Sequence, residues 1–324
     1  MKEIRTVSLI GLGAIGCFLA DGISKVPGIA FCVIAGGERK ERLEKNGVII
    51  NGRQTFFQVT DPAERTGPSD LVIIIPKMTQ LNETLADIKN QVGPDTILMS
   101  PLNGVESEEK VAAVYGEDPI LWSLVRISSV RNGNRINFDT STAVMEYGEK
   151  KDNTVLTDRV KAVNALMKKA GIRTRNPADM ERAIWEKYVC NVSENQVSAL
   201  LGIPFKFWRS SEDANKLRLL VADEVIAVAH KKGIMVEDDY AVKHLERLKS
   251  LPPENMTSTL QDIKSGRKTE VEMFGGTMMR FGRELGVPTP LNEFLYHAIK
   301  VLEKKNDGGT ENIQSISIRE SVKE

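Results

Sequence analysis

The feature that most constrains the fold of this chain is a glycine pattern that joins a short apolar run to a helix-like segment. Residues 6–10 are typical of a buried strand, and residues 14–25 repeat apolar side chains at helical spacing. The pattern G-x-G-x-x-G connects them through Gly11, Leu12, Gly13, Ala14, Ile15 and Gly16. In such a loop the first glycine permits a sharp turn, the second lets a pyrophosphate approach the backbone, and the third lets helix and strand pack closely. Because the helix N-terminus attracts phosphate, this context predicts dinucleotide binding rather than a purely structural glycine turn.

Strands and helices alternate through the first half of the chain. The expected strands lie at residues 29–35, 71–75, 96–99 and 172–174, and the expected helices at 38–46, 81–92 and 156–170. Residues 121–147 are Val-, Ile- and Thr-rich runs joined by the turn Asn132-Gly133-Asn134, which predicts a hairpin. The alternation predicts an α/β fold with a parallel, doubly wound sheet of the Rossmann type.

The pattern changes at Asn176-Pro177, because proline restricts the residue before it and interrupts regular structure. Beyond this point the apolar spacing is helical, over residues 178–200, 211–232, 236–249, 255–280 and 290–305. The sequence therefore predicts a Rossmann-type, dinucleotide-binding domain over 1–177 and a mostly α-helical domain over 178–305. We expect residues 306–324 to form a polar, mobile tail.

Composition excludes several classes of protein. The chain has 44 Lys and Arg and 44 Asp and Glu residues, so its overall charge favours neither nucleic acid nor an anionic membrane. Residues 1–6 lack the pattern of an apolar leader, so we expect none, and the apolar runs are too short to span a bilayer. Cys17, Cys32 and Cys190 form no C-x-x-C pair and have no partnering histidine in the sequence. We therefore expect a cytoplasmic protein without a disulfide framework or a metal site, and without nucleic-acid or membrane partners.

The end of the second expected strand, where a dinucleotide site reads the ribose, carries mixed charges. An NAD-specific site has Asp or Glu there for the 2′-hydroxyl, whereas this chain continues with Glu38, Arg39 and Lys40 after two glycines. Arg39 and Lys40 would neutralise a 2′-phosphate, which favours NADP(H), while Glu38 would suit a ribose hydroxyl. The alternative is that all three are solvated residues in the first turn of a helix.

Two further residues follow buried strands, at the edge where a Rossmann ligand passes. Lys77 comes after the third apolar run, and Asn103 begins an Asn-Gly pair after the fourth. A lysine in such a place is usually a surface residue and an Asn-Gly pair is usually a turn. The alternative is that both side chains face the cofactor or the substrate.

The most informative segment of the second half runs from Trp185 to Asn195. Lys187, Asn191 and Asn195 fall within roughly an 80° arc of one helix face, given about 100° per residue. Asparagine is a poor residue for a helix interior because its amide competes for backbone hydrogen bonds. The strip is either a solvated face with an ordinary lysine or a polar surface that binds a polar ligand in a cleft.

A second polar segment complements this strip. Asn255 and Ser258 are spaced one helical turn apart, and Glu270 lies in the run Thr269-Glu270-Val271-Glu272. Glu270 would pair with a lysine of the cleft, although exposure to solvent is the commoner state of a glutamate.

Taken together, these motifs resemble the ketopantoate reductases, also called 2-dehydropantoate 2-reductases. The resemblance covers nearly the whole chain, and the order and spacing of its motifs are more specific than any one of them. The motifs are the N-terminal glycine pattern, the lysine after the third strand, the Asn-Gly pair, W-x-K-x-x-x-N-x-x-x-N, N-x-x-S, T-E-[IV]-[DE] and a closing G-V-P-x-P.

The resemblance implies the NADPH-dependent reduction of 2-dehydropantoate to pantoate, on the route to pantothenate and coenzyme A. Lys187 would be the general acid for the keto oxygen. Glu270 would support catalysis and the binding of substrate and cofactor. The ammonium group suits this role, because hydride transfer leaves negative charge on the oxygen that a proton donor stabilises. Substrate binding falls to Asn191, Asn195, Asn255 and Ser258, while Lys77 and Asn103 would contact cofactor and substrate near the reacting centre.

Three positions depart from the family's pattern. Gly36 stands near a position where the family often has an arginine for the 2′-phosphate, so Arg39 or Lys40 would replace it. Leu102 precedes Asn103 where glutamine is common, and Glu194 is charged where the family is often apolar. These departures leave the substrate more open than the class of reaction.

Two other functions fit the same residues. One is an NAD(P)H-dependent reductase of another branched 2-keto acid, with an altered pocket. The other is a redox sensor that binds NADP(H) without turnover, although a sensor needs neither Lys187 nor Glu270. A homodimer is one possible assembly, since dimers are the commonest closed oligomers.

Overall fold

The computed structural model describes residues 3–307. The chain divides into two compact units, Met1–Ile184 and Trp185–Glu324. The boundary falls inside helix α6 (Met180–Leu201), a few residues beyond the expected one at Asn176-Pro177. Nearly all of the expected tail lies outside the described residues.

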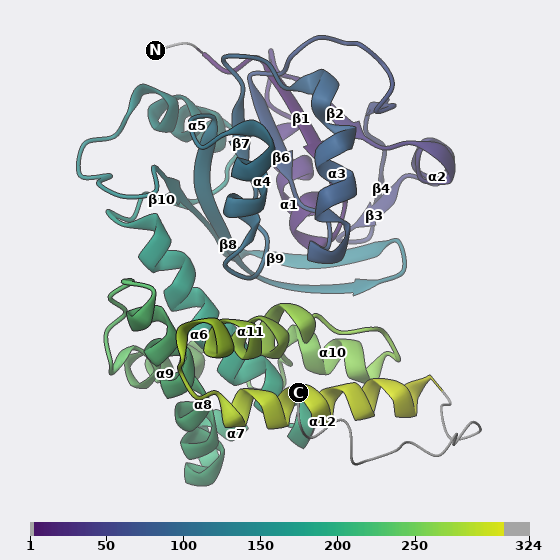
Figure 1. Ribbon diagram of the computed structural model, residues 1–324. Helices are drawn as coiled ribbons and strands as arrows, with labels where there is room; N and C mark the ends of the chain where they lie inside the picture. The colour runs from purple at the N-terminus through teal and green to yellow at the C-terminus, as the bar shows by residue number, and fades with distance from the viewer. Residues whose placement is uncertain (1–2, 308–324) are drawn as a thin grey trace. The chain divides into compact units, whose positions relative to one another are not determined.

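The first unit contains a sheet whose parallel strands follow the order β5-β2-β1-β6-β7-β8. Numbered along the chain, this is the 3-2-1-4-5-6 order of a doubly wound dinucleotide-binding sheet. Figure 1 labels all of these strands except β5. Ile10 pairs with Ile34 on one side and with Ile74 on the other, so three strands end at one edge in register. The parallel strands are β1 (Thr6–Ile10), β2 (Ala30–Ile34), β5 (Val59–Thr60), β6 (Leu71–Ile74), β7 (Ile97–Met99) and β8 (Ile120–Asn132).

Beyond β8 the sheet continues with strands of mixed direction. β8 forms a long antiparallel hairpin with β9 (Arg135–Gly148), and Gly133 takes a left-handed conformation (φ +60°) in its turn. The expected hairpin is therefore present and extends further in both directions than predicted. β3 (Val48–Ile50), β4 (Arg53–Thr55) and β10 (Thr174–Arg175) extend this end of the sheet. The sequence did not predict β3, β4 or β5, because strands of two or three residues leave no periodicity to detect.

Both faces of the parallel sheet are covered by helices, as alternate side chains of its strands require. Leu9 and Ile73 belong to the core that includes α1 (Ala14–Ile23) and α5 (Asp158–Lys169). Ile10 and Ile74 belong to a second core on the opposite face, under α3 (Leu81–Asp87) and α4 (Ser107–Tyr115), which lie in front of the sheet in Figure 1. The doubly wound arrangement thus follows from strands that are apolar on both faces.

The second unit is helical in the described residues. Its elements after α6 are α7 (Phe207–Ser210), α8 (Glu212–Lys231), α9 (Tyr240–Ser250), α10 (Ser258–Lys264), the π-helical turn η3 (Glu272–Gly276), α11 (Thr277–Leu285) and α12 (Pro290–Asn306). None of the helices in the described part of the chain is both long and apolar enough to be a membrane span.

The single helix predicted over 255–280 is wrong, since the structure has α10, a loop, η3 and α11 there. Thr257 caps the start of α10 by accepting a hydrogen bond from the backbone N–H of Leu260. Gly266, with φ +64°, follows its end. Asn255 therefore precedes the helix, and it does not lie one helical turn from Ser258 as expected.

The turn η3 packs closely against α6 and α12 at Gly275. A Cβ atom added at Gly275 would lie 2.6 Å from Gln196 Oε1 of α6 and 2.8 Å from Tyr296 Cβ of α12. Both distances are shorter than carbon packing allows, so only glycine fits between these helices without a shift.

We predict that Gly275→Ala lowers the stability of the protein by about 1–3 kcal/mol, because overpacking of a close-packed interior costs that much. The neighbouring Gly276→Ala is the matched control, since the one tight contact of its Cβ would be with the flexible end of the Glu272 side chain, at 3.1 Å. Urea unfolding of both variants measures the difference. An equal loss of stability in the two variants would contradict the packing argument.

Candidate functional site

The glycine loop between β1 and α1 has the geometry that its three glycines predict. Gly11 has φ +105°, and a Cβ there would lie 2.0 Å from the carbonyl oxygen of Ile75. A Cβ at Gly16 would lie 2.0 Å from the carbonyl oxygen of Gly11, so α1 packs directly on the loop. A Cβ at Gly13, in contrast, would have no neighbour within 4 Å. The first and third glycines serve close packing, and the second leaves open space beside the start of α1.

This loop lies where the order of the parallel strands reverses. β1 has β2 on one side and β6 on the other, and ligands of doubly wound sheets bind outside the carboxyl ends of the strands at such a point. Lys77 is exposed just after β6, and the half-buried Asn103 follows β7. The sheet therefore brings the glycine loop, Lys77 and Asn103 to the same edge, as the sequence predicts.

The two cations expected near a 2′-phosphate differ in their surroundings. Lys40 donates a hydrogen bond to Glu64 at 2.8 Å, and this contact raises the pKa of Lys40. Burial, together with the neighbouring guanidinium groups of Arg42 and Arg131, lowers the pKa of Arg39. Arg39 thus belongs to a group of like charges that favours an anion, whereas the charge of Lys40 is already neutralised. Sequence reasoning missed Arg131, because it reaches this region from the β8–β9 hairpin.

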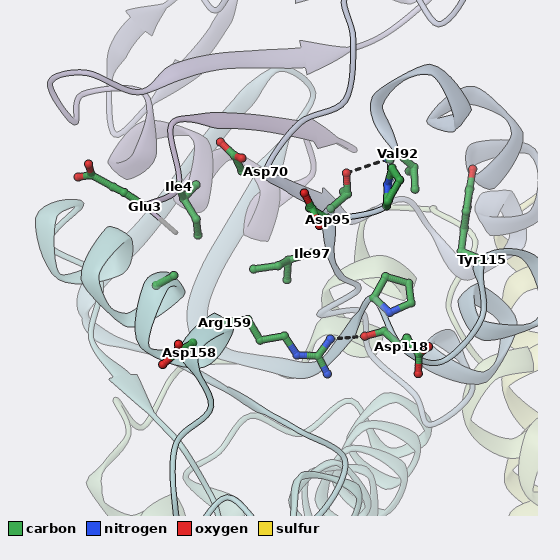
Figure 2. Close-up of a pocket in the computed structure, with 15 residues that line it drawn as sticks. Glu3, Ile4, Asp70, Val92, Asp95, Ile97, Tyr115, Asp118, Asp158 and Arg159 are labelled. Atoms are coloured by element: carbon green, nitrogen blue, oxygen red, sulfur yellow. Dashed lines mark hydrogen bonds between the residues drawn. The ribbon is translucent and has the colours of Figure 1, made fainter. Parts of the chain in front are cut away.

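A cavity of about 510 Å³ in the first unit lies at the opposite edge of the sheet. Its lining includes residues just before four parallel strands, Ile4, Asp70, Thr96 and Pro119. Figure 2 shows its acidic side chains and Arg159, which donates a hydrogen bond to the carbonyl oxygen of Asp118. Because dinucleotides bind at the carboxyl ends of strands, this cavity is separate from the glycine-loop edge.

In the second unit the predicted strip is carried by α6. Lys187, Asn191 and Asn195 follow one another at intervals of one turn on this helix. Lys187 is only 8% exposed and Asn195 is 6% exposed, while Asn191 is half-buried. The strip is therefore not a solvated helix face, and the structure excludes that alternative.

Asn195 and Ser258 are in direct contact. Asn195 Oδ1 accepts hydrogen bonds from Ser258 Oγ at 2.9 Å and from the backbone N–H of Thr259 at 3.2 Å. Asn195 Nδ2 donates to the carbonyl oxygen of Asn191 at 2.9 Å. The amide of Asn195 thus fixes the start of α10 against α6. Asn255 lies in the preceding loop, where its carbonyl oxygen accepts a hydrogen bond from the N–H of Phe205.

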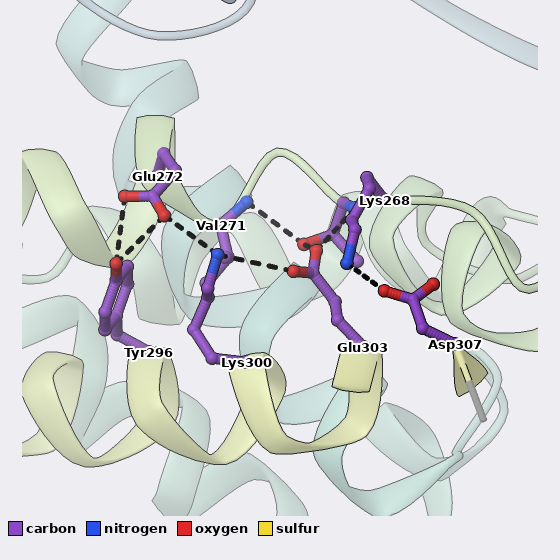
Figure 3. Close-up of polar contacts among 8 residues, drawn as sticks. Lys268, Val271, Glu272, Tyr296, Lys300, Glu303 and Asp307 are labelled. Carbon is purple, nitrogen blue, oxygen red and sulfur yellow. Dashed lines mark hydrogen bonds and ion pairs between the residues drawn. The ribbon is translucent and has the colours of Figure 1, made fainter. Parts of the chain in front are cut away.

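Glu270 is half-buried. The residues on both sides of it are anchored to α12, and Figure 3 shows the contacts of Glu272 and Glu303. On one side, the backbone N–H and the hydroxyl of Thr269 donate to Glu303 Oε1 at 2.7 and 2.6 Å. On the other side, the carboxylate of Glu272 accepts from Tyr296 Oη at 2.9 Å and from Lys300 Nζ at 3.0 Å. These contacts hold the backbone of Glu270 in place.

The charge state of Glu303 supports this anchor. Burial by itself would raise the pKa of Glu303, but the hydrogen bonds from Thr269 and the ammonium group of Lys300 lower it below its usual value. Glu303 is therefore ionised at neutral pH and remains an acceptor for Thr269.

Comparison with known proteins gives two family matches. The family described as ketopantoate reductase PanE/ApbA matches residues 7–152, and its C-terminal part, described as ketopantoate reductase PanE/ApbA C terminal, matches residues 179–303. Together they cover most of both units.

Individual relatives match along the same length. The 2-dehydropantoate 2-reductase of Aquifex aeolicus (strain VF5) is 28% identical over 313 residues, covering 92% of this chain and 97% of that protein. The structure of D-mandelate dehydrogenase with NADH and anilino(oxo)acetate has a TM-score of 0.81 at 21% identity, covering 93% and 99% of the two chains. A dimeric ketopantoate reductase from Staphylococcus aureus has a TM-score of 0.71 at 18% identity, with the same coverage. These structures confirm the expected fold class.

We predict that two substitutions in the glycine loop separate folding from ligand binding. Gly11→Ala should lower the midpoint of thermal unfolding, because alanine at φ +105° is strained by about 1–3 kcal/mol and also meets the backbone of Ile75. Gly13→Ala should unfold like the wild type but bind NADPH more weakly, because its methyl group occupies the space a pyrophosphate needs.

Differential scanning fluorimetry and NADPH fluorescence titration measure the two effects. If Gly13→Ala binds NADPH as tightly as the wild type, the pyrophosphate does not lie on this loop.

Proposed function

This chain belongs to the ketopantoate reductase family, and we propose that it reduces 2-dehydropantoate to pantoate with NADPH, on the route to pantothenate and coenzyme A. The family is one of NAD(P)H-dependent oxidoreductases, which sets the class of reaction. The observation that carries the proposal is the buried Lys187 on α6, at one end of a strip that joins Ser258 through Asn195.

The chemistry assigned to Lys187 is general acid catalysis. Hydride transfer to the keto carbon leaves negative charge on the oxygen, and an ammonium group held there stabilises that charge and then donates its proton. A side chain that is only 8% exposed has little water to compete for its hydrogen bonds. Electrostatic stabilisation is stronger in such surroundings than at a solvated surface.

The remaining polar residues of the second unit are assigned to the substrate. Asn191, on the same stripe as Lys187, and Ser258 would bind polar groups of the keto acid, with Asn255 beside them. Asn195 would position Ser258, since its amide is already engaged at the start of α10. Glu270 would support catalysis and ligand binding from a segment fixed by Thr269 and Glu272.

Cofactor binding is assigned to the first unit, with the pyrophosphate on residues 11–16. Lys77 and Asn103 would lie near the nicotinamide and the substrate, at the carboxyl ends of β6 and β7. Arg39 is the favoured contact for a 2′-phosphate, because Lys40 is paired with Glu64. Bound NADPH supplies the hydride.

A second candidate function is the reduction of another branched 2-keto acid. This alternative is supported by the similar fold of D-mandelate dehydrogenase, whose structure contains NADH and anilino(oxo)acetate. NADPH oxidation by the purified protein, measured against a panel of 2-keto acids, distinguishes the candidates. Clear preference for 2-dehydropantoate supports the first function and preference for another acid supports the second, whereas tight NADPH binding without turnover would indicate a sensor.

We expect a homodimer, by analogy with the dimeric reductase of S. aureus. Light scattering, measured as the protein elutes from a size-exclusion column, gives the molar mass in solution and tests whether the protein is a dimer.

We predict that Lys187→Ala lowers kcat by about 10²–10⁴-fold, the usual contribution of a positioned general acid. The affinity for NADPH should stay within a few-fold of the wild type, because the glycine loop is unchanged. The matched control is Lys216→Ala, which removes an exposed lysine from α8. Steady-state kinetics and NADPH titration give both numbers, and near-normal turnover of Lys187→Ala would refute the assignment.

We predict that Arg39→Ala weakens NADPH binding by about 10–100-fold, since a hydrogen bond to a charged group contributes roughly 1.5–3 kcal/mol. NADH binding should change little, because NADH has no 2′-phosphate. Lys40→Ala is the matched control and should have a smaller effect, because Glu64 already neutralises that ammonium group. Titration of each variant with both cofactors tests this, and a wild-type preference for NADH would overturn the NADP(H) assignment.

A further inference from the structure

We infer that Cys190, Glu194 and His244 form a binding site for a divalent transition metal of the zinc type. The Sγ atom of Cys190, a carboxylate oxygen of Glu194 and a ring nitrogen of His244 all lie within 4.8 Å of one another. The sequence alone predicts no partnering histidine for any cysteine, whereas the fold brings His244 within this distance of Cys190. The two residues are far apart in the sequence, so no local spacing could have shown it.

The positions of the three residues in the fold bring their ligand atoms together. Cys190 and Glu194 are one turn apart on α6, so their side chains lie on the same stripe. His244 comes from α9, and its Nε2 atom is 3.5 Å from Glu194 Oε1. The ring of Tyr240 stacks on that of His244 with centroids 6.2 Å apart, which restricts the orientation of the imidazole.

The spacing suits tetrahedral coordination. Zinc binds imidazole nitrogen and carboxylate oxygen at about 2.0–2.2 Å, so two such ligands on a tetrahedral ion lie roughly 3.3–3.6 Å apart. The observed 3.5 Å between His244 and Glu194 falls within this interval. The Cys190 sulfur lies within 4.8 Å of both other ligand atoms and would move towards the ion to complete three ligands. The fourth position of a three-ligand zinc site takes water or a substrate.

The donor set also suits the metal in charge. Binding replaces the thiol proton of Cys190, so the thiolate and the carboxylate together carry two negative charges that one Zn²⁺ neutralises. Sulfur, nitrogen and oxygen ligands in this combination are typical of zinc, whereas Mg²⁺ and Ca²⁺ prefer oxygen alone. Cys190 is 3% exposed and Glu194 is 7% exposed, so water competes weakly for the ion.

Arg218 of α8 is a positively charged residue close to the proposed metal ion. Its Nη1 atom lies 3.8 Å from Glu194 Oε1, and the same atom donates a hydrogen bond to the carbonyl oxygen of Ala241 at 3.0 Å. Arg218 also donates from Nε and Nη2 to Asn215 Oδ1 at 3.4 Å, so its guanidinium group keeps hydrogen-bond partners when the carboxylate of Glu194 turns to the metal.

The bound ion would link α6 to α9. Cys190 and Glu194 are centred about 80° around α6 from the strip of Lys187, Asn191 and Asn195, at 100° per residue. The ion would therefore fix the helix that carries the strip while lying beside the strip, since Glu194 is only about 20° around the helix from Lys187. Glu194 is also the residue at which the sequence departs from the usual apolar pattern, and metal ligation gives that departure a physical reason.

The test uses the full-length, tag-free protein, stripped of metal with a chelator and dialysed against ZnCl₂. We expect close to one equivalent of bound zinc by elemental analysis, and a higher midpoint of thermal unfolding with zinc than without it. With Co²⁺ in place of Zn²⁺, a thiolate-to-cobalt charge-transfer band should appear in the near ultraviolet. Absence of stoichiometric zinc, or of the cobalt band, would overturn the proposal.

Substitutions of the proposed ligands and of matched control residues show which side chains bind the zinc ion. Cys190→Ala and His244→Gln should each weaken zinc binding by on the order of 100-fold or more, since even residues that only orient a ligand contribute 10–100-fold. Cys32→Ala and His297→Gln, which remove a thiol and an imidazole elsewhere, should bind zinc like the wild type. Equal binding by all four variants would place the ion elsewhere and refute the site. Circular dichroism confirms that each variant is folded, and the cobalt band of the wild-type protein gives an independent result if one is not.

Discussion

The second unit depends on the burial of polar side chains along α6. A buried polar group without a partner costs about 1–3 kcal/mol, so each of these side chains must find a hydrogen bond. Tyr188 donates to carbonyl oxygens of η3, Gln196 donates to Asn292 of α12, and Asn195 accepts from the start of α10. One helix therefore sets the position of three other elements, because each satisfies a polar group that α6 cannot satisfy itself.

This arrangement gives the residues of α6 two tasks at once. Asn195 fixes the first turn of α10 and thereby places Ser258, so the same amide contributes to folding and to the proposed substrate site. The segment around Glu270 is fixed in a similar way, because its neighbours Thr269 and Glu272 form hydrogen bonds with residues of α12. A site built on such contacts is rigid, which favours the fixed geometry that proton transfer requires.

The first unit depends on a different constraint, the close approach of two backbones. Gly11 meets the carbonyl oxygen of Ile75 where β1 and β6 end, and no side chain fits between them. This contact ties the glycine loop to the strand end that carries Lys77. The charges around Arg39 then distinguish this edge of the sheet from the opposite edge, where the cavity with Asp70 and Arg159 lies.

The sequence by itself determined the class of fold, the glycine loop, the strand ends that carry Lys77 and Asn103, and the strip that begins at Lys187. These features are local, since strand and helix periodicity and glycine spacing depend on residues that are close together in the sequence. Only the tertiary structure decided that Asn195 bonds to Ser258, or that helix 255–280 breaks after Lys264. It also decided that Arg131 lies near Arg39 and that Cys190 meets His244. The residues of each pair are distant in the chain, and their proximity depends on how whole helices and strands pack, which no short sequence pattern shows.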